Sequence, residues 1–225
     1  ERLATVSVMA AGLAHEIRNP LGIVGNRIEV MQREAADRHD ATLSRDLETL
    51  AAHVERLRRL TTDLLRFARD EGDTVGAVRL DEVAARISAL LQPTFVTRNI
   101  ALECVANGGI EAIHASEGAI ETVLMNLLLN AADATPSGGR VAIVVRPSPG
   151  RDAVEVEVRD EGAGIAPEVR SRIFEPFFTT KGSQGGTGLG LAVCRTVVER
   201  HGGTIRVASA PGAGAVFTVE LPLHA

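Results

Sequence analysis

The first 70 residues carry two long series of apolar residues that advance in steps of three and four. Such steps place the side chains along one stripe of an α-helix that pairs with another helix. A polar break at residues 36–40 separates the series and predicts two helices of about thirty residues in an antiparallel hairpin. We call these residues the seam: Leu3, Val6, Ala10, Leu13, Ile17, Pro20 or Leu21, Val24, Ile28 and Met31, then Leu43, Leu47, Leu50, Val54, Leu57, Thr61, Leu64 and Ala68.

The two helices of one hairpin cannot bury the whole seam against each other. Two hairpins would bury it by pairing into a four-helix bundle, so the seam predicts a homodimer. The alternative is a single hairpin that packs on the rest of the chain.

One histidine stands apart from the seam. With Ala10 and Leu13 at heptad positions a and d, His15 falls at f, which points away from the partner helix. Glu16 follows it directly, and Asn19 lies one helical turn further on the same face. We expect Pro20 to kink or loosen the helix just beyond. Taken alone, this arrangement is typical of an ordinary surface histidine.

Residues 71–78 are rich in glycine and acids, which predicts a linker between a domain at 1–70 and another at 79–225. The second region alternates between helical and strand-like patterns and is typical of an α+β fold with one mixed sheet under a helical layer. Ser116 and the acid after it indicate a helix start. The expected helices cover 81–91, 116–134 and a segment after residue 187; the expected strands cover 100–105, 110–114, 140–146, 153–159, 204–208 and 215–221.

Polar residues in two places of this region could hold a ligand. Asn126 and Asn130 share one face of the long helix, and their amide oxygens suit a hard cation. Asp160 ends a strand, where it could accept a hydrogen bond from an amino group such as that of adenine, while Gly162 and Gly164 would let a ligand approach the backbone. Each pattern alone also fits a wet helix face or a plain turn.

Two further clusters follow. Residues 174–181 gather half of the phenylalanines beside Lys181, which suggests a flap over a ligand. Residues 182–191 form a glycine-rich loop that opens a helix, where free N–H groups and the helix dipole favour polyphosphate. The loop matches neither the P-loop pattern nor the Rossmann fingerprint.

Composition excludes other classes of protein. A chain of 225 residues that is 45% hydrophobic and 24% charged can bury a core. A net charge of −5 without Trp or Tyr disfavours nucleic-acid binding. No run approaches ~18 apolar residues and no leader pattern is present, so we expect no membrane contact in this stretch. Two cysteines, Cys104 and Cys194, fit a reducing, cytoplasmic compartment. Because the chain opens inside a helical pattern, we expect it to be part of a longer protein.

Five of these patterns, taken in order, resemble the catalytic core of a sensor histidine kinase of a two-component system. The Phe-Phe-Thr-Thr-Lys run is most similar to the nitrogen-regulatory and related kinases. The matching boxes are His15–Leu21 (phosphoacceptor), Asn126–Asn130 (N box), Asp160–Gly164 (first glycine box), Phe174–Phe178 (F box) and Gly186–Gly190 (second glycine box).

The resemblance implies a dimerisation and phosphotransfer domain followed by an ATP-binding α/β sandwich of the gyrase, chaperone and histidine-kinase type. It implies ATP and Mg²⁺ as cofactors, with Asn130 as the metal ligand, Asn126 in support and Asp160 on the adenine amino group. The remaining nucleotide contacts would come from Gly162, Gly164, Lys181, Gly186, Thr187, Gly188, Leu189, Gly190 and Thr218. One departure is Asp133, which stands where many members carry a basic residue.

The resemblance also implies a reaction. His15 would take the phosphoryl group from ATP with Glu16 as proton acceptor or orienter, and would pass it to an aspartate of a response-regulator receiver domain. Asn19 would position water for the reverse, phosphatase reaction. The alternatives are a zinc hydrolase, disfavoured because Asn19 replaces the second histidine of His-Glu-x-x-His; an ATPase clamp or chaperone, which has no use for His15; and a scaffold that only binds nucleotide.

Overall fold

The computed structural model describes residues 2–68, 75–150, 152–180 and 186–224. For residues 2–16, 18–19 and 55–68, apart from Leu57 and Thr61, only the backbone is described. The chain divides into two compact units near residue 71. One is a helical hairpin, and the other contains residues 72–180 and 190–225.

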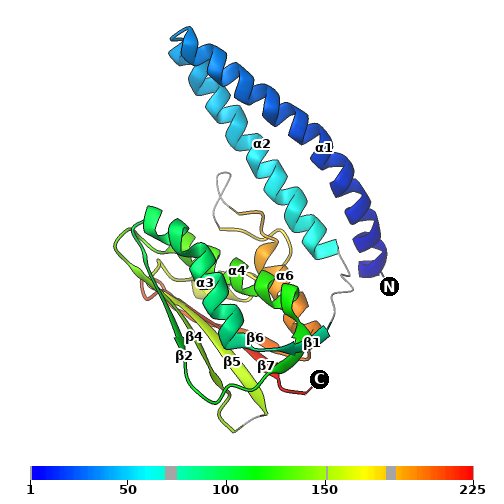
Figure 1. The fold of residues 1–225 in the computed structure, drawn as a ribbon, viewed down its shortest axis with the longest axis vertical. Helices are drawn as coiled ribbons and strands as arrows, with labels where there is room; N and C mark the ends of the chain where they lie inside the picture. The colour runs from blue at the N-terminus through cyan, green and yellow to red at the C-terminus, as the bar shows by residue number, and fades with distance from the viewer. Residues whose placement is uncertain (1, 69–74, 151, 181–185, 225) are drawn as a thin grey trace. The chain divides into compact units, whose positions relative to one another are not determined.

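The hairpin consists of α1 (Arg2–Asp37) and α2 (Ala41–Ala68), as the seam predicts. Pro20 does not end α1, which runs on for more than four further turns and is bowed along its length (Figure 1). His39, with φ of 56°, turns the chain between the helices. Asp40 then caps α2, because its Oδ1 accepts a hydrogen bond from the N–H of Leu43 at 3.0 Å.

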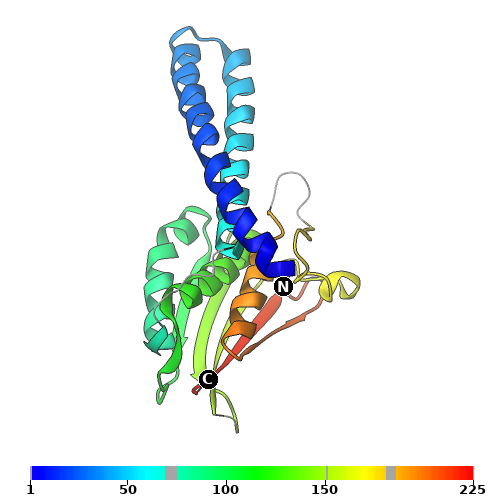
Figure 2. The same ribbon diagram turned by 90° about the vertical axis from the view of Figure 1, so that its right-hand side faces the viewer.

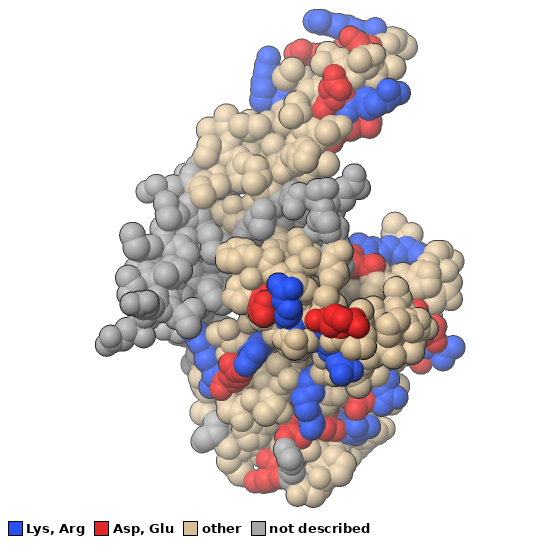
Figure 3. Space-filling view, turned by 180° about the vertical axis from the view of Figure 1, so that it is seen from behind, with Lys and Arg blue, Asp and Glu red and all other residues tan. Residues whose placement is uncertain are grey.

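Much of the described seam stays uncovered within one hairpin. Its buried centre is small and comprises Ile28, Ala35 and Leu47, with Met31, Leu43, Ala51 and Val54 packed around it. Four other seam residues remain 44–52% exposed, namely Ile17, Val24, Leu50 and Leu57. Charged side chains of both signs lie at the end where α1 joins α2, as Figure 3 shows. The expectation that one hairpin cannot bury its own seam is confirmed.

The second unit is built on a five-stranded mixed sheet. Its strands lie in the order β2 (Ala101–Ala106), β4 (Arg140–Pro147), β5 (Ala153–Asp160), β7 (Ala215–Pro222) and β6 (Thr204–Ser209). Only the β2–β4 pair is parallel. Helices α3 (Leu80–Thr97), α4 (Glu117–Ala134) and α6 (Gly190–Arg200) cover one face of the sheet (Figures 1 and 2).

The two faces of the sheet differ in chemistry. On the helical side, Val158 lies between Ile143 and Phe217 across the strands, and all three are buried in the core. On the other side, Glu155 and Glu157 are each only 7% exposed. Their charge is compensated because Arg146 forms ion pairs with both, at 3.1 and 2.5 Å.

The structure corrects the expected boundaries in four places, one of which is the strand expected at 110–114, because it covers residues 113–116 instead. Residues 75–78, expected as linker, form β1 (Val75–Val78), which pairs antiparallel with β3 (Ile113–Ser116) because Val78 and Ile113 enter the core. The expected helix 81–91 runs to Thr97 through Pro93, since buried Phe95 holds its last turn. A short helix, α5 (Pro167–Arg170), was not expected.

The predicted start of the long helix is confirmed. Ser116 caps α4, its hydroxyl accepting a hydrogen bond from the N–H of Ala119 at 3.2 Å. The N–H of Ser116 donates in turn to Nε2 of His201 at 3.1 Å. The ring nitrogen Nδ1 of His201 lies 2.8 Å from the carbonyl of Val197 in the last turn of α6. This imidazole therefore joins the beginning of α4 to the end of α6, the two helices that carry candidate site residues.

Candidate functional site

Asn126 and Asn130 lie one turn apart on α4, and both side chains are half-buried. The Asn126 Nδ2 donates to the carbonyl of Thr122 at 3.0 Å. Its Oδ1 faces the first residue of α6, where a Cβ on Gly190 would lie only 3.0 Å away. Glycine at 190 therefore leaves room for the amide oxygen to keep its position, as the predicted role of Asn126 requires.

Asp160 is the last residue of β5 and is 9% exposed. Its Oδ1 accepts hydrogen bonds from the N–H groups of Gly162 at 2.9 Å and Ala215 at 3.2 Å. Among the described residues, Oδ2 has no hydrogen-bond partner. Burial raises the pKa of this carboxyl above its ordinary value, and the two N–H groups offset only part of that effect. The geometry leaves one carboxylate oxygen to accept from a ligand.

Glycines allow three backbone segments to meet around Asp160. A Cβ on Gly162 would lie 2.7 Å from the carbonyl oxygen of Ala134, the last residue of α4. Gly164 and Gly214 both have φ of 70°, and a Cβ on either would lie within 2.0 Å of a backbone oxygen, that of Ala210 or Asp160. The end of α4, the loop after Asp160 and the turn before β7 thus form one tightly packed region.

Sequence reasoning missed the turn before β7. Gly214 and Ala215 both approach Asp160: a Cβ on Gly214 would lie 1.9 Å from its carbonyl oxygen, and the N–H of Ala215 donates to its Oδ1 at 3.2 Å. Their only sequence signal is glycine before an apolar strand, which is the ordinary pattern of a turn. The contact depends on β5 and β7 pairing directly, with Asp160 opposite Ala215.

The prediction for Thr218 is wrong. Thr218 pairs with Glu157 on one side and Arg206 on the other, so it lies on the sheet face that carries the charged side chains. Asp160 and Phe217 lie on the opposite, helical face, because successive residues of a strand alternate. Thr218 therefore does not point toward the Asp160 region, where the facing residue of β7 is Ala215.

Several predicted residues lie outside what the structure describes. Lys181 lies outside the described residues. His15, Glu16 and Asn19 lie within α1, but their side chains are not described. Gly186–Leu189 are not grouped with the second unit. Their own backbone shows φ of 51° at Gly186 and 70° at Gly188, and the N–H of Leu189 donates to Thr187 Oγ1 at 3.2 Å. Their roles stay predictions.

The phenylalanine cluster is anchored at two of its three rings. Phe174 meets Phe217 edge to face, with centroids 6.4 Å apart. The guanidinium of Arg172 lies 4.6 Å from the centre of the Phe178 ring. Phe177 is 67% exposed and has φ of 65°, a backbone conformation that is energetically unfavourable for a residue with a bulky side chain. The segment is therefore fixed to the core, and the flap remains a prediction.

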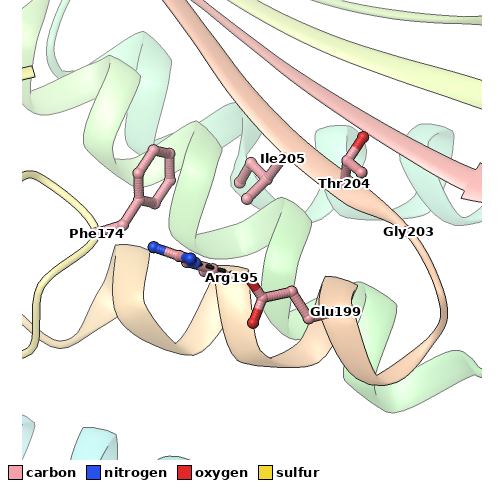
Figure 4. Close-up of a pocket in the computed structure, with 6 residues that line it drawn as sticks. All are labelled: Phe174, Arg195, Glu199, Gly203, Thr204 and Ile205. Carbon is pink, nitrogen blue, oxygen red and sulfur yellow. Dashed lines mark hydrogen bonds and ion pairs between the residues drawn. The ribbon is translucent and has the colours of Figure 1, made fainter. Parts of the chain in front are cut away.

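A pocket elsewhere in the unit contains none of the predicted nucleotide-binding residues. It lies between the phenylalanine cluster, α6 and β6, and Figure 4 shows Arg195 and Glu199 paired along its floor at 2.7 Å. Its lining residues are Phe174, Arg195, Glu199, Gly203, Thr204 and Ile205. Arg195 and Glu199 offset each other's charge in this pocket.

Among the described residues, no three His, Cys, Asp or Glu side chains gather into a metal cluster. A divalent cation at Asn130 would therefore take most of its oxygen ligands from phosphates and water, which is how Mg²⁺ is commonly held. Asn126 and Asn130 fit such a cation as amide-oxygen donors.

Two protein families match the sequence. Residues 5–73 match "His Kinase A (phospho-acceptor) domain", and residues 115–225 match "Histidine kinase-, DNA gyrase B-, and HSP90-like ATPase". Among curated relatives, the chain is 38% identical over 226 residues to the sensor histidine kinase ZraS of Salmonella typhi, covering 100% of this chain and 47% of ZraS. It is 34% identical to the histidine-protein kinase AtoS of Escherichia coli K12, covering 36% of AtoS. The chain thus spans about half, or less, of these relatives.

Solved structures that are similar to this chain are also histidine kinases. The catalytic domain of histidine kinase ThkA is 32% identical, with a TM-score of 0.60 over 67% of this chain and 96% of that domain. Full-length ShkA in complex with AMPPNP is 27% identical, with a TM-score of 0.74 over 96% of this chain and 46% of ShkA. ThkA in complex with response regulator protein TrrA is 30% identical, with a TM-score of 0.70 over 99% of this chain and 63% of ThkA.

Proposed function

The chain belongs to the sensor histidine kinases of two-component systems, and on that premise we propose that it phosphorylates its own His15 with ATP and passes the phosphoryl group to a response regulator. The observation that carries the proposal is Asp160, a buried carboxylate whose Oδ1 is held by two backbone N–H groups while Oδ2 is left to accept. The AMPPNP bound by ShkA supports an adenine nucleotide as the ligand.

In this proposal, Oδ2 of Asp160 accepts the adenine amino group. Gly162 and Gly164 form the floor of the base pocket, and their lack of a Cβ lets the carbonyls of Ala134 and Ala210 pack against this loop. Asn130, with Asn126 in support, contributes amide oxygen to a Mg²⁺ ion, whose chemistry is to neutralise phosphate charge. Lys181 and residues 186–190 donate to the phosphates.

The reaction is a displacement at the γ-phosphorus. An unprotonated ring nitrogen of His15 attacks, the P–N bond forms, and the P–O bond to ADP breaks. Neutral imidazole is available at pH 7 because the ordinary histidine pKa is ~6.5. Glu16 accepts or orients the proton on the other ring nitrogen, which raises the nucleophilicity of the attacking one. An aspartate of the receiver domain then takes the phosphoryl group from His15.

Incubation with γ-labelled ATP tests this function. The kinase yields label on the protein that is lost in acid and kept in alkali, as a phosphoramidate requires. Release of labelled phosphate without labelled protein would instead support an ATPase clamp of the same superfamily. Binding with neither label nor release would support a nucleotide-binding scaffold.

We also propose that the chain works as a homodimer through its uncovered seam. Leu50 and Leu57 are 52% and 47% exposed in a single hairpin, and apolar residues in such a regular series are covered in stable bundles. Charge at both positions is expected to convert a dimer to a monomer, because it would put unpaired carboxylates into the interface.

Sedimentation of Leu50→Glu/Leu57→Glu beside the unchanged chain measures this effect. Ala52→Glu is the matched control, since Ala52 is exposed and lies across α2 from the seam. The dimer proposal fails if the unchanged chain sediments as a monomer, or if the double variant remains dimeric.

Asn19 is proposed to position water for dephosphorylation of the partner. The expected result of Asn19→Ala is a phosphorylated regulator that persists several-fold longer, with autophosphorylation of His15 retained. The measurement is the decay of label on a purified receiver domain. An unchanged decay rate in a variant that still labels His15 would contradict the role.

The partner and the location are parts of the same proposal. The ThkA–TrrA complex supports a receiver domain as the partner class. None of the described helices combines the length and hydropathy that a membrane-spanning segment needs. Because the reaction consumes ATP and phosphorylates a receiver domain, we propose that this part of the protein lies in the cytoplasm.

A further inference from the structure

Asp133 lies on the same stripe of α4 as the two candidate asparagines. Positions 126, 130 and 133 advance by four and three residues, which places their side chains one above another on one helix face. Asp133 is followed by Ala134, whose carbonyl packs against Gly162 of the Asp160 loop. An acid therefore stands beside the proposed nucleotide site, where it would repel phosphates if it were not compensated.

Arg98 compensates that acid. Its Nη1 lies 2.5 Å from Oδ1 of Asp133, and the two side chains are 42% and 38% exposed. Asp133 is the one partner of the Arg98 guanidinium among the described residues. A guanidinium has five N–H donors, so most of them are left for another acceptor.

The backbone around Arg98 is fixed to the end of α4. Arg98 closes α3, and its N–H donates to the carbonyl of Thr94 at 3.2 Å. The next residue, Asn99, accepts from the N–H of Gly138 at 2.7 Å and donates from Nδ2 to Ser137 Oγ at 3.0 Å. The guanidinium is therefore carried by a corner that is bonded to the loop directly after α4.

Positive charge is scarce on this face. The second half of α4, residues 125–134, has no Lys or Arg, and Lys181 is the only lysine of the whole chain. Two neutral amides and an acid cannot compensate the negative charge of a polyphosphate. Arg98 is the cation that the described contacts bring to the stripe of Asn126, Asn130 and Asp133.

We propose that Arg98 is a nucleotide-binding residue: Asp133 holds its guanidinium beside the Asn130 face, and its remaining N–H groups donate to the phosphates of the bound nucleotide. This inference rests on the proposed nucleotide site. It assigns to a residue of α3 the charge that α4 does not supply.

Titrations of ATP, ADP and adenosine against the full chain, with Mg²⁺ present, test the proposal. Arg98→Gln is expected to weaken ATP and ADP about tenfold, the typical effect of losing one charge-assisted hydrogen bond, and to leave adenosine unchanged. Adding Asp133→Asn to Arg98→Gln should restore part of the affinity, because the negative charge that repels the phosphates is then removed.

Arg86→Gln is the matched control. Arg86 also joins α3 to α4, through Glu117 and through Glu121 at 2.7 Å, but it meets the first turns of α4. Equal affinities of Arg98→Gln and the unchanged chain would overturn the proposal. The proposal would also fail if Arg98→Gln lost as much affinity for adenosine as for ATP. It would fail as well if Arg86→Gln weakened ATP binding as much as Arg98→Gln does, because an arginine that only joins α3 to α4 predicts both results. If the unchanged chain binds none of the three ligands, the proposed function itself fails, and this inference with it.

Discussion

Replacing His15 with Gln is expected to abolish phosphorylation of the protein by ATP while nucleotide binding stays unchanged. Glutamine keeps helix propensity and polarity at this position of α1, but its amide nitrogen is not a nucleophile. The expected product is a P–N bond to an imidazole, which glutamine does not supply. The loss should be complete, with no acid-labile label above background.

The control for this variant is His53→Gln. His53 is an exposed histidine of α2, so the substitution removes an imidazole from the same hairpin. It should retain full label, and both variants should bind ATP with the affinity of the unchanged chain. Label that persists in His15→Gln, or that disappears in His53→Gln, would assign the phosphoryl group to another residue.

The hairpin shows what sequence can predict well. Steps of three and four are a local property of the chain, and they placed both helices and the break at 36–40 within two residues. The same local pattern also identified seam residues, such as Leu50, that one hairpin leaves exposed. Patterns of this kind need no knowledge of the partner surface.

The errors arise where pairing between distant segments decides the outcome. The local sequence of Val75–Val78 predicts a linker. The segment forms a strand because it pairs with Ile113–Ser116, which lies far away in the sequence. The family motif predicts that Thr218 belongs to the site, yet strand register puts it on the opposite face of the sheet. The sequence marks Asp133 as a departure from the family pattern, but its ion pair with Arg98, 35 residues away, is visible only in the fold.

Asp160→Asn is expected to weaken ATP binding by about one to two orders of magnitude, since a hydrogen bond to a charged group contributes ~1.5–3 kcal/mol. The substitution is nearly isosteric, and the amide oxygen can still accept from Gly162 and Ala215. The oxygen at Oδ2 becomes an NH₂ group, which faces the adenine amino group donor to donor. Affinity is measured by titration with ATP, and Asp152→Asn, an exposed acid at the β4–β5 turn, is the control.

The same variant should have a separate effect on stability without nucleotide. Burial raises the pKa of Asp160, so as pH rises above 3.8 the unfolded chain releases this proton before the folded one does. The free energy that this carboxyl contributes to folding therefore decreases as the pH rises from 3.8 to the raised pKa of the folded state. At any pH above that raised pKa, the contribution stays at its lowest value. Asp160→Asn removes that penalty, so at pH 7 its unfolding temperature should equal or exceed that of the unchanged chain.

Two comparisons separate this effect from damage to the fold. The stability advantage of Asp160→Asn should shrink as the pH is lowered toward 3.8, where the carboxyl is protonated in both states. With saturating ATP at pH 7, the unchanged chain should unfold at a higher temperature than Asp160→Asn. The reason is that only the unchanged chain gains the full stabilisation from the bound ligand. A variant that is less stable at every pH would show that the two Oδ1 hydrogen bonds outweigh the burial penalty.

Base specificity gives the sharpest test of the role of Asp160. Inosine triphosphate carries a carbonyl oxygen where adenine has its amino group, so it presents an acceptor to Oδ2, and the unchanged chain should reject it. In Asp160→Asn the new NH₂ group can donate to that oxygen, and the preference between the two nucleotides should invert. The measured quantity is the ratio of the two dissociation constants. If the ratio is the same for both proteins, Asp160 stabilises its loop through Oδ1 but does not hydrogen-bond to the base. The contact to the adenine amino group would then come from another residue of the site.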